Sequence, residues 1–365
     1  MMPDGDNRIV LETDDLPEIK PPDKIVIELE DLDDVEPATV YPGMPADSAS
    51  FAPTVKPHSN PIVQSNILQN VLAGAIGGLL AWLITEIFFG DDRSTAQSVQ
   101  QMIMEMALFG GVIGGLMGSA LGAAEGVITR VAPVALRGGA IALGVGFLGG
   151  MIGGASGQVL YGMMGGGSFE ISMGMQVLAR TLAWGLVGLF IGLGQGISYR
   201  SGKKVINGLI GGMVGGLVGG LLFDLIGNVT IGGGMSRFLA ITLMGAAVGG
   251  AIGMVDEIRK EAWLKVIAGP MAGKEYILFN DITRLGSSPK CDIVIYRDPQ
   301  VAPQQATIQA TNGRYSIVNN SAANPVYLDE RPVSSSALGN GQSIRMGSTV
   351  FLFQLKASNK EFDFT

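Results

Sequence analysis

The sequence of 365 residues has one cysteine, one histidine and few charged residues, which make up 15% of the chain. Because Cys291 has no second cysteine to pair with, a disulfide within the chain is excluded, and a zinc site built from histidine and cysteine lacks its ligands. A catalytic triad would have to use His58, which lies in the linker-like sequence KPHSNP. We therefore expect no catalytic residues, no metal and no cofactor, and the protein is predicted not to be an enzyme.

Glycine and apolar residues dominate the composition instead. The chain contains 55 glycines, 47% of its residues are hydrophobic, and its mean hydropathy is +0.37. With only 17 prolines and no glycine at every third position, a collagen-like fibre is excluded. This composition is typical of a chain that contacts lipid.

The chain divides into segments of different composition. Residues 1–65 carry 14 acidic and 4 basic side chains and ten of the 17 prolines, so we predict a disordered acidic tail. An alternative is that this tail docks on basic residues of the C-terminal domain as an autoinhibitory arm. Residues 66–255 hold 46 of the 55 glycines and only 15 charged residues, which predicts a transmembrane domain.

The transmembrane domain is predicted to be an all-α polytopic bundle of six helices, because each apolar run approaches or exceeds the roughly 20 residues needed to cross a bilayer. The runs lie near residues 67–89, 104–128, 138–164, 175–197, 205–227 and 238–255. Six crossings place both termini on one side, together with loops that contain Arg130, Arg137, Arg200, Lys203 and Lys204. The positive-inside rule assigns that side to the cytoplasm.

The glycine-rich segment also repeats. The sequence that begins at Asn70 recurs at Asn207 and more loosely at Gly138, which predicts three helical hairpins. The second helices of these hairpins align through the glycines Gly114, Gly188 and Gly245, and on this alignment Glu125 and Asp256 are equivalent.

Within the helices, glycines recur at every fourth position and therefore share one helix face. On the second and fifth helices these glycines are Gly110, Gly114, Gly118, Gly122, Gly208, Gly212, Gly216 and Gly220. Faces without side chains let two helices approach closely, so a tightly packed glycine-zipper bundle is predicted. A pore or substrate path lined by these faces is the alternative.

Four charged residues fall inside or at the ends of the apolar runs. Glu86 and Asp224 lie near the outer ends of the first and fifth helices, and Arg180 and Arg237 near the outer starts of the fourth and sixth. By depth, Asp224 is placed to pair with Arg237 or Arg180, which would reduce the cost of burying the charges. No acidic residue lies at the midplane, so the sequence favours a structural bundle over an ion-coupled transporter.

The pattern changes after Trp263 to short alternating runs separated by turns, which predicts a small all-β sandwich over about 260–358. The order of its motifs resembles a forkhead-associated (FHA) domain. The segment from Leu285 to Val294 resembles the glycine-led loop and following strand of that family, and Asp298 to Ala306 occupies its "DPxVSRxHA" position. Leu338 to Gln342 and Ile344 to Gly347 resemble its two closing motifs.

The resemblance also shows where this sequence departs from phosphothreonine-reading FHA domains. Ser287 stands at the position of the family's arginine, Ala302 at that of its phosphate-binding serine and Gln305 at that of its architectural histidine. Because the arginine fork is missing, the resemblance implies a degenerate FHA domain that binds protein without requiring phosphate. In this respect it is similar to the cytoplasmic domains of type III secretion inner-membrane components. The residues expected to contact a partner are Ser287, Ser288, Lys290, Gln304, Gln305 and Asn324.

Together these features predict an integral, multi-pass membrane scaffold, with both termini in the cytoplasm and the bacterial inner membrane as its location. It would recruit a cytosolic protein or peptide through the FHA-like domain, and no nucleic-acid partner is expected. A homo-oligomer is left open. The alternatives are a channel or transporter regulated by the FHA domain, and a membrane-anchored reader of phosphothreonine peptides.

Overall fold

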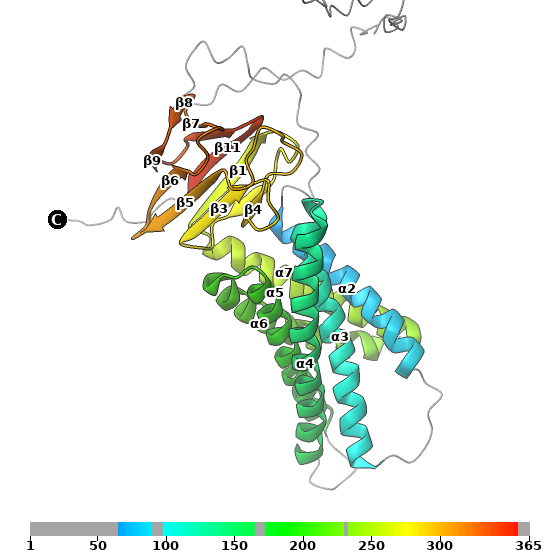
Figure 1. Cartoon of the computed structure of the whole chain (residues 1–365). Helices are drawn as coiled ribbons and strands as arrows, with labels where there is room; N and C mark the ends of the chain where they lie inside the picture. Colours follow the sequence, from blue (N-terminus) through cyan, green and yellow to red (C-terminus); the bar gives the residue numbers. More distant parts are fainter. Residues whose placement is uncertain (1–64, 90–97, 165–171, 230–232, 357–365) are drawn as a thin grey trace, which may run out of the picture. The chain divides into compact units, whose positions relative to one another are not determined.

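A computed structural model describes residues 65–89, 98–164, 172–229 and 233–356. The predicted acidic tail falls outside these residues, apart from its last one. The described part consists of six long helices followed by a sandwich of short strands (Figure 1).

Each of the six helices is long and apolar enough to cross a membrane. They are α2 (Asn66–Phe89), α3 (Val99–Ile128), α4 (Ala132–Met164), α5 (Met173–Ser198), α6 (Gly202–Val229) and α7 (Gly234–Arg259). Each helix contains one of the apolar ranges expected from the sequence. The tight turns between α3 and α4 and between α5 and α6 place Arg130 and Arg200 in the left-handed region, at φ 58° and 55°.

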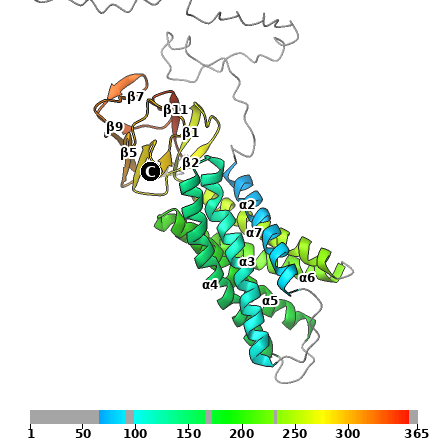
Figure 2. The same ribbon diagram turned by 45° about the vertical axis from the view of Figure 1, so that its right-hand side comes forward.

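The six helices form a closed ring in which each helix packs on its neighbours in sequence and α7 packs back on α2. Figures 1 and 2 show α3 and α4 side by side in this arrangement. The most extensive contacts are between α3 and α4, α5 and α6, and α2 and α7. Each pair joins the second helix of one predicted hairpin to the first helix of another. The ring therefore has threefold pseudo-symmetry, which agrees with the sequence repeat.

The glycine faces form these three helix pairs. A Cβ atom on Gly114 would collide with the carbonyl oxygen of Gly146 in the α3–α4 pair. Equivalent collisions would occur between Gly188 and Gly212 in the α5–α6 pair, and between Gly74 and Gly245 in the α2–α7 pair. All eight glycines expected to pack helices face a neighbouring helix in this way. Helix backbones therefore fill the grooves that the glycines leave.

The interior of the ring is filled by side chains of α3, α5 and α7 at equivalent repeat positions. They form the sets Ile113, Val187 and Met244, then Met117, Ile191 and Val248, and then Leu121, Gln195 and Ile252. Each of these nine side chains is at most 2% exposed. The described residues thus form a packed core, which favours the structural interpretation of the glycines over an open path.

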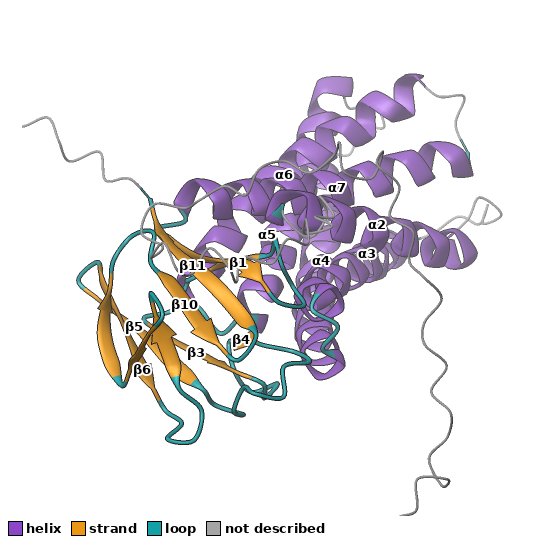
Figure 3. Ribbon diagram, turned by 90° about the horizontal axis from the view of Figure 1, so that it is seen from above, coloured by secondary structure: helices purple, strands orange, loops and turns teal. Residues whose placement is uncertain are grey.

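The C-terminal domain is built from two β-sheets (Figure 3). Its strands are β1 (Ala262–Ala268), β2 (Glu275–Ile277), β3 (Ile282–Gly286), β4 (Ile293–Val294), β5 (Ala306–Thr311), β6 (Arg314–Asn319), β7 (Val326–Leu328), β8 (Arg331–Val333), β9 (Ser335–Leu338), β10 (Ser343–Met346) and β11 (Thr349–Leu355). One sheet has the order β2-β1-β11-β10-β7-β8 and the other β4-β3-β5-β6-β9. Alternate residues such as Leu264, Ile308, Ile344 and Phe353 point inward and form one core.

Candidate functional site

Three loops meet at one edge of the sandwich, where the predicted partner-binding residues lie. They are the loops at 287–292, 295–305 and 320–325. The first two are joined through their backbones, because Ser287 N donates to Ala302 O at 3.0 Å and Ser288 N donates to Pro303 O at 3.1 Å. Gly286 is needed at this contact, since a Cβ atom there would collide with the Pro303 carbonyl.

Gln305 holds the loops together from inside the domain. Its Nε2 donates to the backbone oxygen of Asn324 at 2.6 Å, and its Oε1 accepts a hydrogen bond from Ala302 N at 2.9 Å. The Asn324 side chain in turn donates to Gln300 O at 2.6 Å. Gln305 is only 1% exposed, so the structure corrects its expected role as a partner contact. It acts instead as the architectural residue of the loop edge.

The other expected contacts are accessible. Lys290 and Gln304 are exposed, and Ser287, Ser288 and Asn324 are half-buried. Together they offer hydroxyl, amide and ammonium groups, with no guanidinium among these six residues to form a bidentate contact. These six residues can therefore hydrogen-bond a peptide, but they do not supply the arginine fork expected of a strong phosphate site, and the guanidinium of the second loop, Arg297, lies over the ring of Tyr296.

A carboxylate stabilises the base of this edge. Asp298 accepts hydrogen bonds from Ser348 N at 2.8 Å, Ser348 Oγ at 2.9 Å and Thr349 Oγ1 at 3.1 Å. Burial alone would raise the pKa of Asp298, but these hydrogen bonds outweigh it and hold the pKa below the usual 3.8. Gly347, at φ 59°, leaves room for the carboxylate, because a Cβ atom there would lie 2.6 Å from Asp298 Oδ1.

Two of the four charged residues noted near the helix ends form an ion pair at the end of the bundle remote from the sandwich. Arg237 binds Glu86 through two hydrogen bonds, Nε to Oε2 at 2.9 Å and Nη2 to Oε1 at 2.8 Å. Arg180 lies over the ring of Phe223, 5.9 Å from its centroid. The side chain of Asp224, which we expected to pair with one of these arginines, lies outside the described residues.

At the opposite end of the bundle, the sandwich inserts a lysine between helices. Lys274 lies before β2 and is 1% exposed. Its Nζ donates to Gln69 Oε1 on α2 at 2.7 Å and to Glu125 Oε2 on α3 at 3.0 Å. The sequence reasoning did not assign this contact. The sequence feature that points to this contact is Glu125, an acidic residue in the last turn of an apolar helix.

A second lysine forms the corresponding pair within the bundle. Lys204 of α6 binds Asp256 of α7, and Asn207 Nδ2 donates to the other carboxylate oxygen at 3.0 Å. Lys204 also lies over the ring of Phe279 from the sandwich, at 5.4 Å. Glu125 and Asp256 occupy equivalent repeat positions, so each acid at the end of a second helix is neutralised by a lysine from another element.

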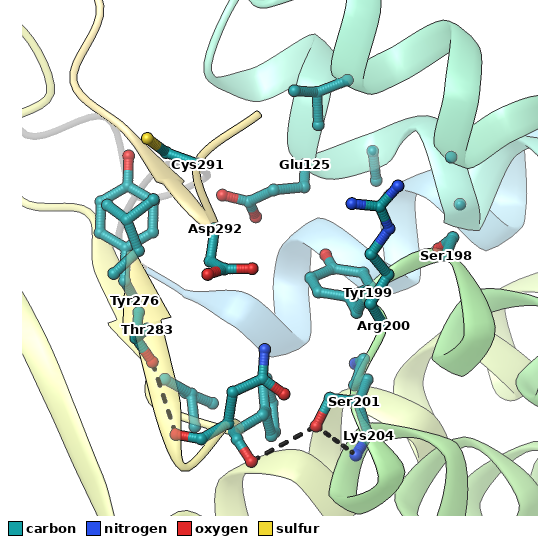
Figure 4. Close-up of a pocket in the computed structure, with 18 of the residues that line it drawn as sticks. Glu125, Ser198, Tyr199, Arg200, Ser201, Lys204, Tyr276, Thr283, Cys291 and Asp292 are labelled. Carbon is teal, nitrogen blue, oxygen red and sulfur yellow. Dashed lines mark hydrogen bonds between the residues drawn. The ribbon is translucent and has the colours of Figure 1, made fainter. Parts of the chain in front are cut away.

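Between the bundle and the sandwich is a cavity of about 170 Å³ (Figure 4). Glu125, Arg200 and Lys204 line it from the helices, and Tyr276 and Asp292 line it from the sandwich. Burial raises the pKa of Tyr276 far above its usual value, and the nearby Glu125 raises it further. The Tyr276 phenol therefore stays protonated and adds no negative charge to the cavity wall.

Comparisons with known proteins match the sandwich. Residues 265–357 fit a family model described as "Inner membrane component of T3SS, cytoplasmic domain", where T3SS is the type III secretion system. The glycogen accumulation regulator GarA of Mycobacterium tuberculosis is 32% identical over 92 residues, which cover 25% of this chain and 56% of GarA. The oxoglutarate dehydrogenase inhibitor of Corynebacterium jeikeium is also 32% identical over 92 residues, covering 25% of this chain and 63% of that protein. The match thus spans only about three-fifths of either relative.

Solved structures match the same segment. The FHA domain of the CT664 protein from Chlamydia trachomatis is 28% identical, covers 27% of this chain and all of that chain, and gives a TM-score of 0.25. The FhaA FHA domain complexed with the intracellular domain of Rv3910 is 17% identical, covers 26% of this chain and 99% of that chain, and gives a TM-score of 0.24.

Proposed function

The C-terminal sandwich is an FHA-type domain joined to six apolar helices, and from this premise we propose that the protein is a membrane scaffold that recruits a cytosolic protein. The loop edge of the sandwich is the binding surface. The bundle anchors that surface at the membrane, with the sandwich on the cytoplasmic side as the basic residues of the helix turns suggest.

The observation that supports this proposal most is the network around Gln305. A buried side chain that bonds Ala302 and Asn324 fixes two loops before any partner arrives. Such preorganisation lowers the entropy cost of binding. Ser287 and Gln304 remain accessible at this fixed edge, so the Ser287 hydroxyl and the Gln304 amide can contact a peptide.

In this proposal, the partner does not need to be phosphorylated in order to bind. The arginine position of phosphothreonine readers holds Ser287, and Lys290 provides a point charge rather than a fork. A partner bound through backbone and amide contacts loses little affinity on dephosphorylation.

A photoreactive cross-linker tests the surface directly in intact cells. Placed at Gln304, on the loop edge, it should capture a cytosolic protein. Placed at Gln309, which is also exposed but lies on β5 away from the loops, it should not. The double variant Ser287→Ala/Lys290→Ala should reduce capture at Gln304 while the protein still inserts in the membrane. Equal capture at the two positions, or capture unchanged by the double variant, would contradict the proposal.

Binding of phosphorylated and plain peptides from the captured protein then distinguishes the phosphothreonine-reading alternative. We expect their affinities to differ by less than about tenfold, which corresponds to about 1.4 kcal/mol. A larger preference for the phosphorylated peptide would make the protein a phosphopeptide reader.

A further inference from the structure

In the cavity between the bundle and the sandwich, most acidic side chains have a basic partner, whereas several basic side chains have no acidic partner among the described residues. Each of its helix-borne acids already has a lysine partner, Glu125 with Lys274 and Asp256 with Lys204. The acid of β2, Glu275, lies near two further lysines, Lys260 at 3.6 Å and Lys265 at 3.7 Å. These three carboxylates therefore add little negative potential to the cavity.

The basic side chains of the cavity are less fully paired. Arg137 of α4, Arg200 of the α5–α6 turn and Lys290 of the sandwich all line it. Within the described part of the chain, none of these three side chains forms an ion pair or donates a hydrogen bond. Arg137 and Arg200 are both exposed, and their like charges lie close enough to repel each other, although solvent weakens this repulsion.

One carboxylate opposes this positive charge. Asp292 lines the cavity from the sandwich, and its Oδ2 accepts a hydrogen bond from Arg284 N at 2.9 Å. Figure 4 shows the Asp292 carboxylate turned into the cavity, toward the side where Arg200 lies. With three cationic groups against this single acid, the unpaired charge of the cavity is still positive.

The position of the cavity suggests where an anion would come from. Its helical walls come from the first turns of α2, α4 and α6, the last turns of α3 and α7 and the turn after α5. These turns are the ends of apolar helices, and lipid headgroups lie at that depth. Basic pockets between helix ends are typical sites for lipid phosphates.

We propose that this cavity binds the phosphate group of an anionic ligand between Arg137, Arg200 and Lys290. The guanidinium groups supply paired N–H donors to the phosphate oxygens, and Lys290 closes the site from the sandwich. The bound phosphate relieves the repulsion between the two arginines and connects the bundle to the FHA-type domain. An anionic phospholipid and a soluble phosphate share this chemistry, and the experiment separates them.

The test uses the full chain purified in detergent, with lipid binding followed by native mass spectrometry. Wild type should retain phosphatidylglycerol over phosphatidylcholine by at least about tenfold. The variant Arg137→Gln/Arg200→Gln should lose this preference. The matched control is Arg130→Gln, because Arg130 is exposed and has the same left-handed backbone as Arg200 but does not line the cavity.

The variant Asp292→Asn should change phosphatidylglycerol binding in the opposite direction. It removes the opposing charge and should increase phosphatidylglycerol binding, whereas Lys290→Gln should decrease it. These two single variants decide the question even if the double arginine variant does not fold. A purely structural role for the polar cavity would not produce opposite shifts.

Inorganic phosphate is the soluble probe, with the thermal unfolding midpoint as the readout. Stabilisation of wild type by phosphate, lost in Arg137→Gln/Arg200→Gln, together with no preference among lipids, would keep the site and assign it a soluble ligand. The proposal is overturned if neither phosphate nor phosphatidylglycerol binding depends on these arginines, or if Arg130→Gln has the same effect.

Discussion

Lys274 of the sandwich and Glu125 of helix α3 form an ion pair at 3.0 Å, although they lie 149 residues apart in sequence. The lysine is almost completely buried and the carboxylate is about three-quarters buried. Their contact joins the FHA-type domain to the helical bundle in the same way that Lys204 joins Asp256 within the bundle. A buried ion pair therefore connects the two domains.

Replacement of Lys274 by methionine should weaken this connection. The apolar part of the side chain is kept, but Gln69 and Glu125 lose their donor, and we expect a loss of about 1–3 kcal/mol in unfolding free energy. Thermal unfolding of the full chain measures this loss. Lys265→Met is the control, because Lys265 lies on the surface 3.7 Å from Glu275 and should contribute less than about 1 kcal/mol.

A double-mutant cycle separates the ion pair from other effects. If Glu125 and Lys274 interact directly, Glu125→Gln should cost much less in the Lys274→Met background than in wild type. Additive losses would show that the two residues stabilise the protein independently.

The helix packing predicts that replacement by alanine changes stability very differently at two glycines. Gly114→Ala places a Cβ atom against the Gly146 carbonyl and should destabilise the bundle by about 1–3 kcal/mol or more. Gly144→Ala on the neighbouring helix meets no atom within 4 Å and should leave stability unchanged or slightly increased. Unfolding in mixed detergent micelles compares the two variants, and equal effects would contradict the glycine-zipper packing.

The helical part of the fold was largely predictable because its signals are local. Apolar length indicates a spanning helix, and glycines four residues apart indicate a face without side chains. The sequence repeat even placed Glu125 and Asp256 at equivalent positions. Ring closure of α7 on α2 was not predictable in the same way, because it depends on contacts between the ends of the helical segment.

The functional contacts were harder to predict because they join distant segments. Lys274 lies at the end of the turn between β1 and β2. Nothing near it in sequence indicates Glu125 or Gln69 as partners. Gln305 was expected at the binding edge from its motif position, but its burial depends on how the loops at 295–305 and 320–325 pack together.

Gln305→Ala should loosen the loop edge without unfolding the sandwich. The substitution leaves Ala302 N without its acceptor, whereas Asn324 O keeps the hydrogen bond from Asn319 Nδ2, and we expect a loss of about 1–3 kcal/mol in unfolding free energy. Hydrogen exchange should accelerate at Ala302, while core amides such as that of Ile308 remain protected. Unchanged exchange at Ala302 would show that the backbone contacts of Ser287 and Ser288 suffice to hold the loops.

The low pKa of Asp298 predicts a pH dependence of the sandwich. Because its pKa is lower in the folded state than the usual 3.8, the ionised carboxylate stabilises the fold at neutral pH, and this contribution is lost as the pH falls below that value. Asp298→Asn should therefore lower stability at neutral pH by about 1–3 kcal/mol, through weakened bonds to Ser348 and Thr349.

The unfolding midpoint of Asp298→Asn should then depend less on pH in the acid range than that of wild type. Circular dichroism melts of both proteins between neutral pH and the acid range measure the difference. Parallel pH profiles would show that other carboxylates control acid unfolding, since the stabilisation by Asp298 disappears only when that group is protonated.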